Sequence, residues 1–196
     1  METKDRLIDA ATKLFAERGF YGVSIADVAQ QLGITKQALL YHFGSKEKLY
    51  EAVLKTISEE TIATLQDYQS DDRSAEVQLT EMFQRHFDQV LGQPASSRVI
   101  MRELMDNRQR AESVKDWVLK PYLDGIAELV GRVPNLTERS WEDRLAFAYQ
   151  VQGAAFYFMI SIDTLKNMYG PSAFKQIKQS YAKVLKEQVE RFIAQS

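Results

Sequence analysis

The side chains best suited to contact another molecule lie in the segment 23–43. Thr35, Lys36 and Gln37 are consecutive, and Tyr41 follows Gln37 by about one helical turn. If this stretch is a helix that exposes them, their hydroxyl, ammonium and amide groups can donate hydrogen bonds to phosphates or base edges. A glutamine is also able to bond two edge atoms of an adenine. The residue types therefore indicate a helix that reads the major groove of DNA.

Two short helices joined by a tight turn would position that face. Ser24 and Thr35 are each suited to cap the start of a helix. Ala29 is small where the two helices would cross, and Gly33 supplies the left-handed residue of the turn. The apolar residues that would pin the helices together are Val28, Leu32, Ile34 and Leu39. The segment therefore has the pattern of a helix-turn-helix.

The rest of the chain repeats apolar residues at intervals of three and four, so we expect an all-α protein of about nine helices. Gly170 and Pro171 should separate the last two helices. Pro121 should either kink its helix or mark the true start. Besides the two short helices, the expected ranges are about 4–18, 46–68, 75–91, 99–105, 114–130, 138–168 and 171–194.

Composition excludes several other classes of chemistry. The 196 residues contain no cysteine, and the two histidines, His42 and His86, are too far apart for a metal-binding pair on one helix. We find no phosphate loop, dinucleotide fingerprint or nucleophile elbow, and we expect neither an enzyme nor a cofactor or metal. The acidic start and the short apolar stretches predict a cytoplasmic protein without a signal or membrane span. The net charge of −2 argues against indiscriminate nucleic-acid coating and leaves room for a local basic face.

The amino-terminal segment resembles the tetracycline-repressor-like (TetR/AcrR) family of transcriptional regulators. The resemblance extends over about residues 6–54 and implies a three-helix DNA-binding domain at 1–50, followed by a helical ligand-binding and dimerisation domain at 51–196. The carboxy-terminal part matches only in length, helix number and its two long last helices. The stretches that carry the resemblance are Ala10 to Phe15, Glu-Arg-Gly-Phe-Tyr-Gly-Val-Ser at 17–24, Ile-Ala at 25–26, Ala29, Gly33, and Leu-Tyr-His-Phe-Gly-Ser-Lys-Glu-Lys-Leu at 40–49.

The resemblance also implies individual DNA contacts. Ser24 and Tyr41 would contact phosphates, and Lys46, at the start of a helix, would contact or steer a phosphate. His42 is either a phosphate contact or a packing residue beside Phe43. The expected DNA-binding residues are Ser24, Thr35, Lys36, Gln37, Tyr41, His42 and Lys46. Phe20, Tyr21 and Phe43 are expected in the core.

A ligand pocket in the carboxy-terminal helices is the next implication of the resemblance. Flexible and aromatic side chains suit an apolar cavity, although such residues also build ordinary cores. Arg102, Glu103 and Asn107 are further polar candidates that would equally suit a solvated helix face. The candidate pocket residues are Phe83, His86, Phe87, Met101, Met105, Trp117, Tyr122, Tyr149, Gln152 and Phe156.

The last two helices would pair with those of a second copy as a four-helix bundle. Their apolar residues exceed the number that one small domain needs inside, and a self-complementary interface would explain the surplus. Intramolecular packing is the alternative for any one of them. The candidate interface residues are Ala155, Met159, Ile162, Ile177, Tyr181, Val184 and Val189.

Taken together, these expectations describe a homodimeric regulator that binds a palindromic operator in double-stranded DNA. A small, largely apolar effector would bind, shift the fourth helix and release the DNA, and repression is the expected mode. The alternative is a helix-turn-helix dimer without a small-molecule pocket, which responds to a protein partner or acts architecturally.

Overall fold

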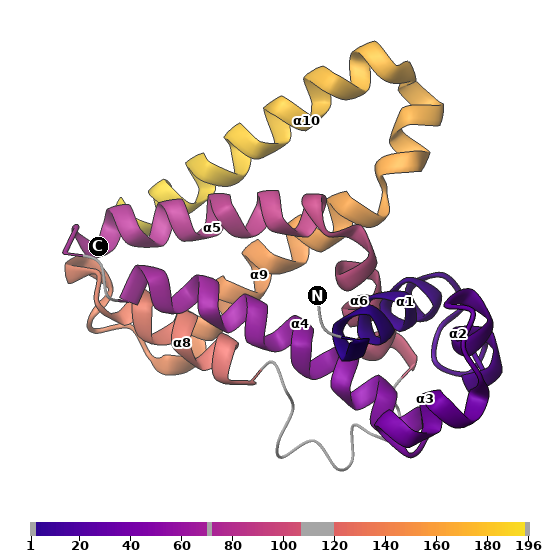
Figure 1. The fold of residues 1–196 in the computed structure, drawn as a ribbon. Helices are drawn as coiled ribbons and strands as arrows, with labels where there is room; N and C mark the ends of the chain where they lie inside the picture. Colours follow the sequence, from indigo (N-terminus) through magenta and orange to yellow (C-terminus); the bar gives the residue numbers. More distant parts are fainter. Residues whose placement is uncertain (1–2, 70–71, 107–119, 195–196) are drawn as a thin grey trace. The chain divides into compact units, whose positions relative to one another are not determined.

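The computed structural model describes residues 3–69, 72–106 and 120–194, and regular structure in these ranges is entirely helical (Figure 1). These ranges contain nine α-helices and one 3-10 turn, which confirms the all-α prediction. The elements are α1 (Thr3–Arg18), α2 (Ile25–Gln31), α3 (Lys36–Phe43), α4 (Lys46–Gln69), α5 (Ala75–Gly92), α6 (Pro94–Asp106), α8 (Lys120–Gly131), the 3-10 turn Pro134–Leu136, α9 (Trp141–Ile160) and α10 (Ile162–Ala194).

The helices group into two compact units. The first unit contains α1, α2, α3, α4 as far as Glu60, and α6. The second contains the remainder of α4 from Thr61 together with α5, α8, α9 and α10. The helix α4 therefore belongs to both units. The domain division at residue 50 came from the family resemblance and stays a prediction. The first unit also contains α6, which is distant from the other helices of that unit in the sequence.

The helix α1 supplies a buried apolar face to the first unit. One face of α1 buries Leu7, Ala11, Leu14 and Phe15, and the helix ends at Gly19, whose φ of 71° is the left-handed conformation that glycine adopts without strain. The apolar spacing and the stop signal were both visible in the sequence.

The helix α6 is fastened to the first unit by two polar side chains. Arg102 donates from Nε to the Ala16 carbonyl at 3.0 Å and from a terminal nitrogen to the Glu17 carbonyl at 2.9 Å, at the end of α1. The buried Glu103 accepts a hydrogen bond of 2.9 Å from the Tyr50 hydroxyl on α4. Arg102 and Glu103 therefore hold helices together, and the expectation of a pocket contact or a solvated helix face is corrected for both.

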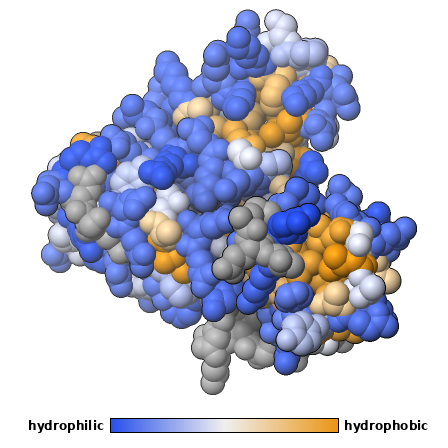
Figure 2. All heavy atoms as spheres, viewed as in Figure 1, coloured by the Kyte–Doolittle hydropathy of each residue, from blue (hydrophilic) through white to orange (hydrophobic). Residues whose placement is uncertain are grey.

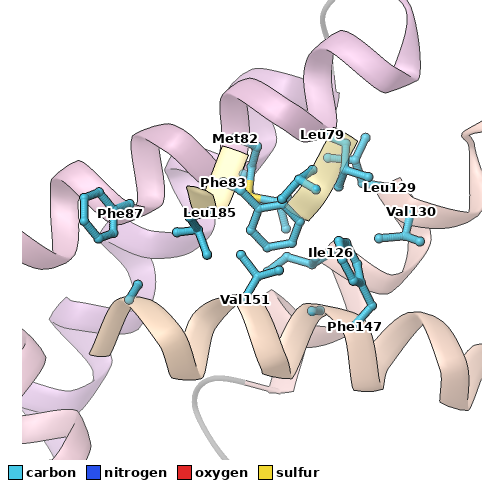
Figure 3. Packing of buried hydrophobic residues seen from close by; sticks show 14 of the residues in the cluster. Leu79, Met82, Phe83, Phe87, Ile126, Leu129, Val130, Phe147, Val151 and Leu185 are labelled. Carbon is cyan, nitrogen blue, oxygen red and sulfur yellow. The ribbon is translucent and has the colours of Figure 1, made fainter. Parts of the chain in front are cut away.

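The core of the second unit forms where α5 meets α8, α9 and α10. Figure 3 shows Met82 and Phe83 of α5 pointing toward Ile126 of α8 and Val151 of α9. Phe83 meets the Phe147 ring edge-on, with 5.7 Å between the ring centroids. Residues from α5 and from the later helices α8, α9 and α10 thus share one apolar interior.

Some helix boundaries differ from the expected ones. The predicted helix 138–168 is interrupted at Ser161, whose hydroxyl donates to the Tyr157 carbonyl at 2.7 Å and competes with the regular helical pattern. The chain bends by 67° between α9 and α10. The expected break at Gly170 is present as a second kink, with a φ of 79° inside α10. The helix α6 begins at Pro94, earlier than the predicted residue 99, because proline suits the first turn of a helix.

Pro121 is the second described residue of α8, and whether it kinks the helix or marks its start stays a prediction. Residues 114–119 of the expected helix 114–130 lie outside the described residues.

Within the described ranges no single helix is long and apolar enough to cross a membrane. Only α9 and α10 taken together meet that length and composition, across their bend, and α9 buries several of its apolar side chains in the second unit's core.

Candidate functional site

The start of α2 is fixed by a reciprocal cap between Ser24 and Asp27. The Asp27 backbone N–H donates to Ser24 Oγ at 3.2 Å, and the Ser24 backbone N–H donates to Asp27 Oδ2 at 2.7 Å. The Ser24 hydroxyl also donates to Asp27 Oδ2, at 2.5 Å, and this bond is the main reason that the pKa of the Asp27 carboxyl is lowered. Both Ser24 donors are used inside the protein. A phosphate contact by Ser24 therefore requires its hydroxyl to exchange Asp27 for the phosphate.

The turn between α2 and α3 follows the pattern expected of a helix-turn-helix. Gly33 has a φ of 66°, and the next residue, Ile34, donates its backbone N–H to the Ala29 carbonyl at 3.0 Å. Val28, Ala29 and Leu39 are buried between the helices. The turn thereby fixes the direction in which α3 leaves α2, and it leaves the opposite face of α3 to solvent.

That outer face of α3 carries the expected polar residues. Thr35 caps the helix by accepting the Ala38 backbone N–H at 3.1 Å, and Lys36 and Gln37 are exposed in the first turn. Tyr41 is 89% exposed, although a ring of this size is usually covered in a folded protein. An aromatic hydroxyl, an amide and an ammonium group on one short helix form a hydrogen-bonding surface suited to a DNA groove.

His42 and Lys46 differ in how firmly they are held. His42 is exposed and meets the Tyr41 ring edge-on at 5.7 Å, so the structure leaves it accessible. Lys46 Nζ donates to the Phe20 carbonyl at 3.0 Å and lies 4.2 Å from the centre of the Phe20 ring. Its ammonium group is therefore positioned before any ligand arrives.

An open groove of about 600 Å³ runs along the first unit beside the start of α2. It brings together three of the expected DNA-contact residues, Ser24, Lys36 and Lys46, while Thr35, Gln37, Tyr41 and His42 are not part of its lining. Tyr21 also lines the groove. The groove and the α3 face together form the candidate nucleic-acid surface.

Tyr21 corrects an expectation, because it is not a core anchor. Its side chain is 72% exposed and rests edge-on against Phe20, with ring centroids 5.3 Å apart. Phe20 is half-buried against Phe15 and Tyr50, and Phe43 is buried, as expected. Sequence reasoning missed Tyr21 as a surface residue because two adjacent aromatics gave no signal for which one points inward.

The candidate pocket residues do not form one cluster. Met101 and Met105 lie on α6 in the first unit, Tyr149 is exposed on α9, and Trp117 and Asn107 lie outside the described residues. Phe83 and Phe87 belong to the second unit's core and also border a cavity of about 300 Å³ between α5 and α10. Three of the candidates do gather in one place, namely His86, Tyr122 and Phe156, and Gln152 precedes Phe156 by about one turn of α9.

His86 and Tyr122 form the buried centre of that group. The Tyr122 hydroxyl and His86 Nδ1 are 3.0 Å apart, and the Phe156 and His86 rings lie 6.0 Å apart in an edge-on arrangement. Burial lowers the pKa of His86 to about 4 and raises the pKa of Tyr122, so both side chains are neutral at pH 7.

The candidate interface residues divide into two kinds. Ala155, Met159 and Val189 are buried in their own unit, which is the intramolecular alternative that the sequence left open. Ile162, Ile177 and Tyr181 are half-buried against the same core, and Val184 is exposed on α10. Sequence reasoning proposed none of the exposed apolar residues of α9 for the interface, and it assigned Tyr149 to the pocket. These residues are Trp141, Tyr149, Tyr157 and Ile160.

Comparison with known proteins points to one family of regulators. The model of the bacterial regulatory proteins of the tetR family matches residues 7–53. The negative regulator of the icaADBC biofilm operon, IcaR, of Staphylococcus aureus strain Newman is 44% identical over 52 residues, which are 26% of this chain and 28% of IcaR. The regulator RutR of Escherichia coli K12 is 38% identical over 68 residues, which are 35% of this chain and 32% of RutR. The matches thus span about a third or less of these relatives.

Solved structures match over nearly the whole fold. The fatty acid degradation regulator FadR from Bacillus halodurans has a TM-score of 0.75 at 18% identity and covers 98% of each chain. The ketosteroid regulator KstR2 of Mycobacterium tuberculosis has a TM-score of 0.69 at 19% identity, covering 95% of this chain and 94% of that one. The described helices of this chain therefore share the fold of these regulators.

Proposed function

We propose that this chain is a homodimeric transcriptional repressor that a small, largely apolar effector releases from its operator. The match of residues 7–53 to the model of the bacterial regulatory proteins of the tetR family supports this proposal. In this proposal the first unit binds double-stranded DNA and the second unit binds the effector. No catalytic role is assigned to either unit.

The outward face of α3 is the observation that carries the DNA-binding part. Its exposed Gln37 and Tyr41 stand on a helix whose opposite side is buried, and Lys46 supplies a fixed positive charge near the groove. One helix of eight residues reads few base pairs. Two such helices in a symmetric dimer would read half-sites about 34 to 36 Å apart, and a palindromic operator follows from that symmetry.

An exposed apolar face on α9 and α10 supports the dimer. Tyr149, Gly153, Tyr157 and Ile160 recur along one exposed face of α9, and nothing lies within 4 Å of the position that a Gly153 Cβ would occupy. That open space allows a partner helix to approach closely. Figure 2 shows hydrophobic atoms gathered where α10 turns, within a mainly hydrophilic surface. Exposed apolar area of this kind is typical of a contact surface.

An apolar effector is supported by the lining of the second unit. The cavity between α5 and α10 has Phe83, Phe87 and Leu185 in its wall, and His86 and Tyr122 form a buried polar pair among aromatics. Two of the similar solved proteins are named as regulators of fatty acid degradation and of ketosteroids. Fatty acids and ketosteroids are largely apolar molecules. Effector binding would move α4, because this helix runs from one unit into the other.

Selection of random duplex DNA by the purified full-length chain tests this proposal. We expect enrichment of a palindrome, and we expect its affinity to fall steeply as salt is raised. Failure of a folded dimer to enrich any sequence would contradict the proposal and favour a partner-dependent or architectural role. Protection against thermal unfolding by apolar compounds would support a dimer that binds an effector over a dimer that lacks a pocket.

A further inference from the structure

A buried histidine in the second unit has one ring nitrogen without a partner. His86 is only 5% exposed, and within the described residues its Nε2 makes no hydrogen bond. Its Nδ1 is 3.0 Å from the Tyr122 hydroxyl. A buried polar atom left without a partner costs about 1 to 3 kcal/mol, so such an atom in a well-packed core calls for an explanation.

The hydrogen bond at Nδ1 of His86 determines whether Nε2 carries a proton. A neutral imidazole carries one N–H and one acceptor nitrogen. If Nδ1 carried the proton, it would donate to Tyr122, and the Tyr122 hydroxyl proton would then have no acceptor among the described residues. If Tyr122 donates to Nδ1 instead, both of these groups are satisfied. The second arrangement leaves an N–H on Nε2 of His86 that has no acceptor among the described residues.

A second buried donor lies nearby on α9. The side-chain nitrogen of Gln152 is also buried and without a partner in the described part of the chain. Gln152 precedes Phe156 by four residues, so the two side chains occupy the same face of α9, and the Phe156 ring lies against the His86 ring. Two unsatisfied N–H groups therefore come from α5 and α9 toward one apolar region.

We infer that His86 and Gln152 form the polar end of the effector site and together bind the carbonyl oxygen of an uncharged, otherwise apolar molecule. A carbonyl oxygen has two lone pairs and can accept from both donors at once. His86 has two described contacts, Tyr122 and Phe156, and both are uncharged. A neutral acceptor therefore fits better here than a carboxylate, because burying a carboxylate without a countercharge is costly. Tyr122 acts as a positioning residue that fixes the proton on Nε2. This inference rests on the proposed effector-binding role of the second unit.

Matched ketones and hydrocarbons test the inference without DNA. The probes are acetophenone with ethylbenzene, 2-nonanone with nonane, and cyclohexanone with methylcyclohexane, each added to the full-length chain. The readouts are the unfolding temperature and the ¹H–¹⁵N resonances of the His86 imidazole and the Gln152 side-chain amide. We expect at least one ketone to raise the unfolding temperature more than its hydrocarbon does, and to shift both resonances.

Substitutions then assign the preference to the two donors. Gln152→Leu should reduce affinity for the ketone about tenfold, the usual loss for one hydrogen bond, and leave affinity for the hydrocarbon unchanged. His86→Leu should have the same selective effect, and Tyr122→Phe a smaller one. Gln179→Leu, an equivalent change at an exposed position of α10 outside the cavity lining, is the control and should leave the ketone preference intact.

Three results would overturn the inference. The first is an equal change of unfolding temperature with every ketone and its hydrocarbon. The second is a ketone preference that survives both Gln152→Leu and His86→Leu. The third is a persistent nuclear Overhauser effect from His86 Nε2–H to a bound water that no ketone displaces. The last result would assign the donors to a structural water. Because none of these readouts involves DNA, they can fail while operator selection succeeds, and the reverse.

Discussion

The two units place their polar side chains in opposite ways. On α3 of the first unit, Gln37 and Tyr41 stand in solvent on a helix whose other side is buried. In the second unit, His86 and Tyr122 are buried among aromatic rings. An exposed polar face suits a large, hydrated and charged partner such as DNA, whereas buried polar groups in an apolar setting suit a small molecule that gives up its water. The arrangement of polar groups thus separates the two functions more clearly than composition does.

The largest expected effect tests whether the second unit depends on its shared core. Phe83→Ala removes a buried ring that packs against Phe147, and it should lower the free energy of unfolding by about 3 to 5 kcal/mol. Urea unfolding followed by circular dichroism measures this loss. Gln84→Ala, at the exposed neighbouring position, serves as the control and should change stability by less than about 0.5 kcal/mol. A loss below about 1 kcal/mol for Phe83→Ala would contradict the core described above.

The pH dependence of stability tests the buried polar side of the comparison. His86 has a pKa of about 4 in the folded protein against 6.5 as its ordinary value, because burial disfavours its charged form. Below pH 6.5 the unfolded chain binds a proton that the folded chain does not, so the free energy of unfolding falls as the pH is lowered toward 4. This histidine should account for a loss of about 2 kcal/mol between pH 7.5 and pH 5.

Urea unfolding at the two pH values, repeated with His86→Phe, isolates that contribution. The variant should lose about 2 kcal/mol less than the unchanged chain over the same interval. If the free energy of unfolding depends on pH identically in both proteins, His86 is accessible to protons in the folded state. That result would contradict the contrast between the exposed polar side chains of α3 and the buried polar side chains of the second unit.

A single exposed amide tests the reading role of α3. Gln37→Ala should reduce discrimination at one base pair of the selected operator about tenfold, because a glutamine that contacts a base edge carries sequence information. Unfolding stability should stay nearly unchanged, since the side chain is exposed. Competition binding with operators that vary at one position measures the effect, and Gln31→Ala on α2 is the matched control. Uniform weakening across all operators would reassign Gln37 to a backbone contact.

The smallest expected effect concerns the local cap that orients α2. Ser24→Ala removes the side-chain hydrogen bonds to Asp27 and should cost about 1 kcal/mol of stability. The pKa of Asp27 should rise toward its ordinary value, because the Ser24 hydroxyl is the main cause that lowers it. Carboxyl titration by nuclear magnetic resonance follows this change. Ser45→Ala weakens the equivalent cap of α4 and should leave the pKa of Asp27 as it is.

Features set by a few neighbouring residues were predictable from the sequence. The cap at Ser24 and the left-handed turn at Gly33 each depend on contacts within five residues, so residue type and spacing were sufficient. The exposed face of α3 followed from them. The break at Ser161 is also local. The Ser161 hydroxyl bonds the carbonyl four residues earlier, a contact that often bends a helix, and residue type does not reveal whether a serine will make it.

Features that depend on distant residues were not predictable. Arg102 binds the Ala16 and Glu17 carbonyls across about 85 residues of sequence, and no pattern near Arg102 indicates this partner. The pairing of His86 with Tyr122 is of the same kind. Periodicity identifies a buried helix face but not which helix covers it, so the candidate pocket list mixed residues of both units.

The central claim is that DNA binding by one unit and ligand binding by the other are coupled. The most direct test is the affinity of the dimer for its selected duplex, measured with and without a saturating ketone that the chain binds. We expect the ketone to reduce duplex affinity at least fivefold, and we expect bound duplex to reduce ketone affinity by the same factor, as linkage requires. Tight ketone binding that leaves duplex affinity unchanged would contradict the claim for that ligand.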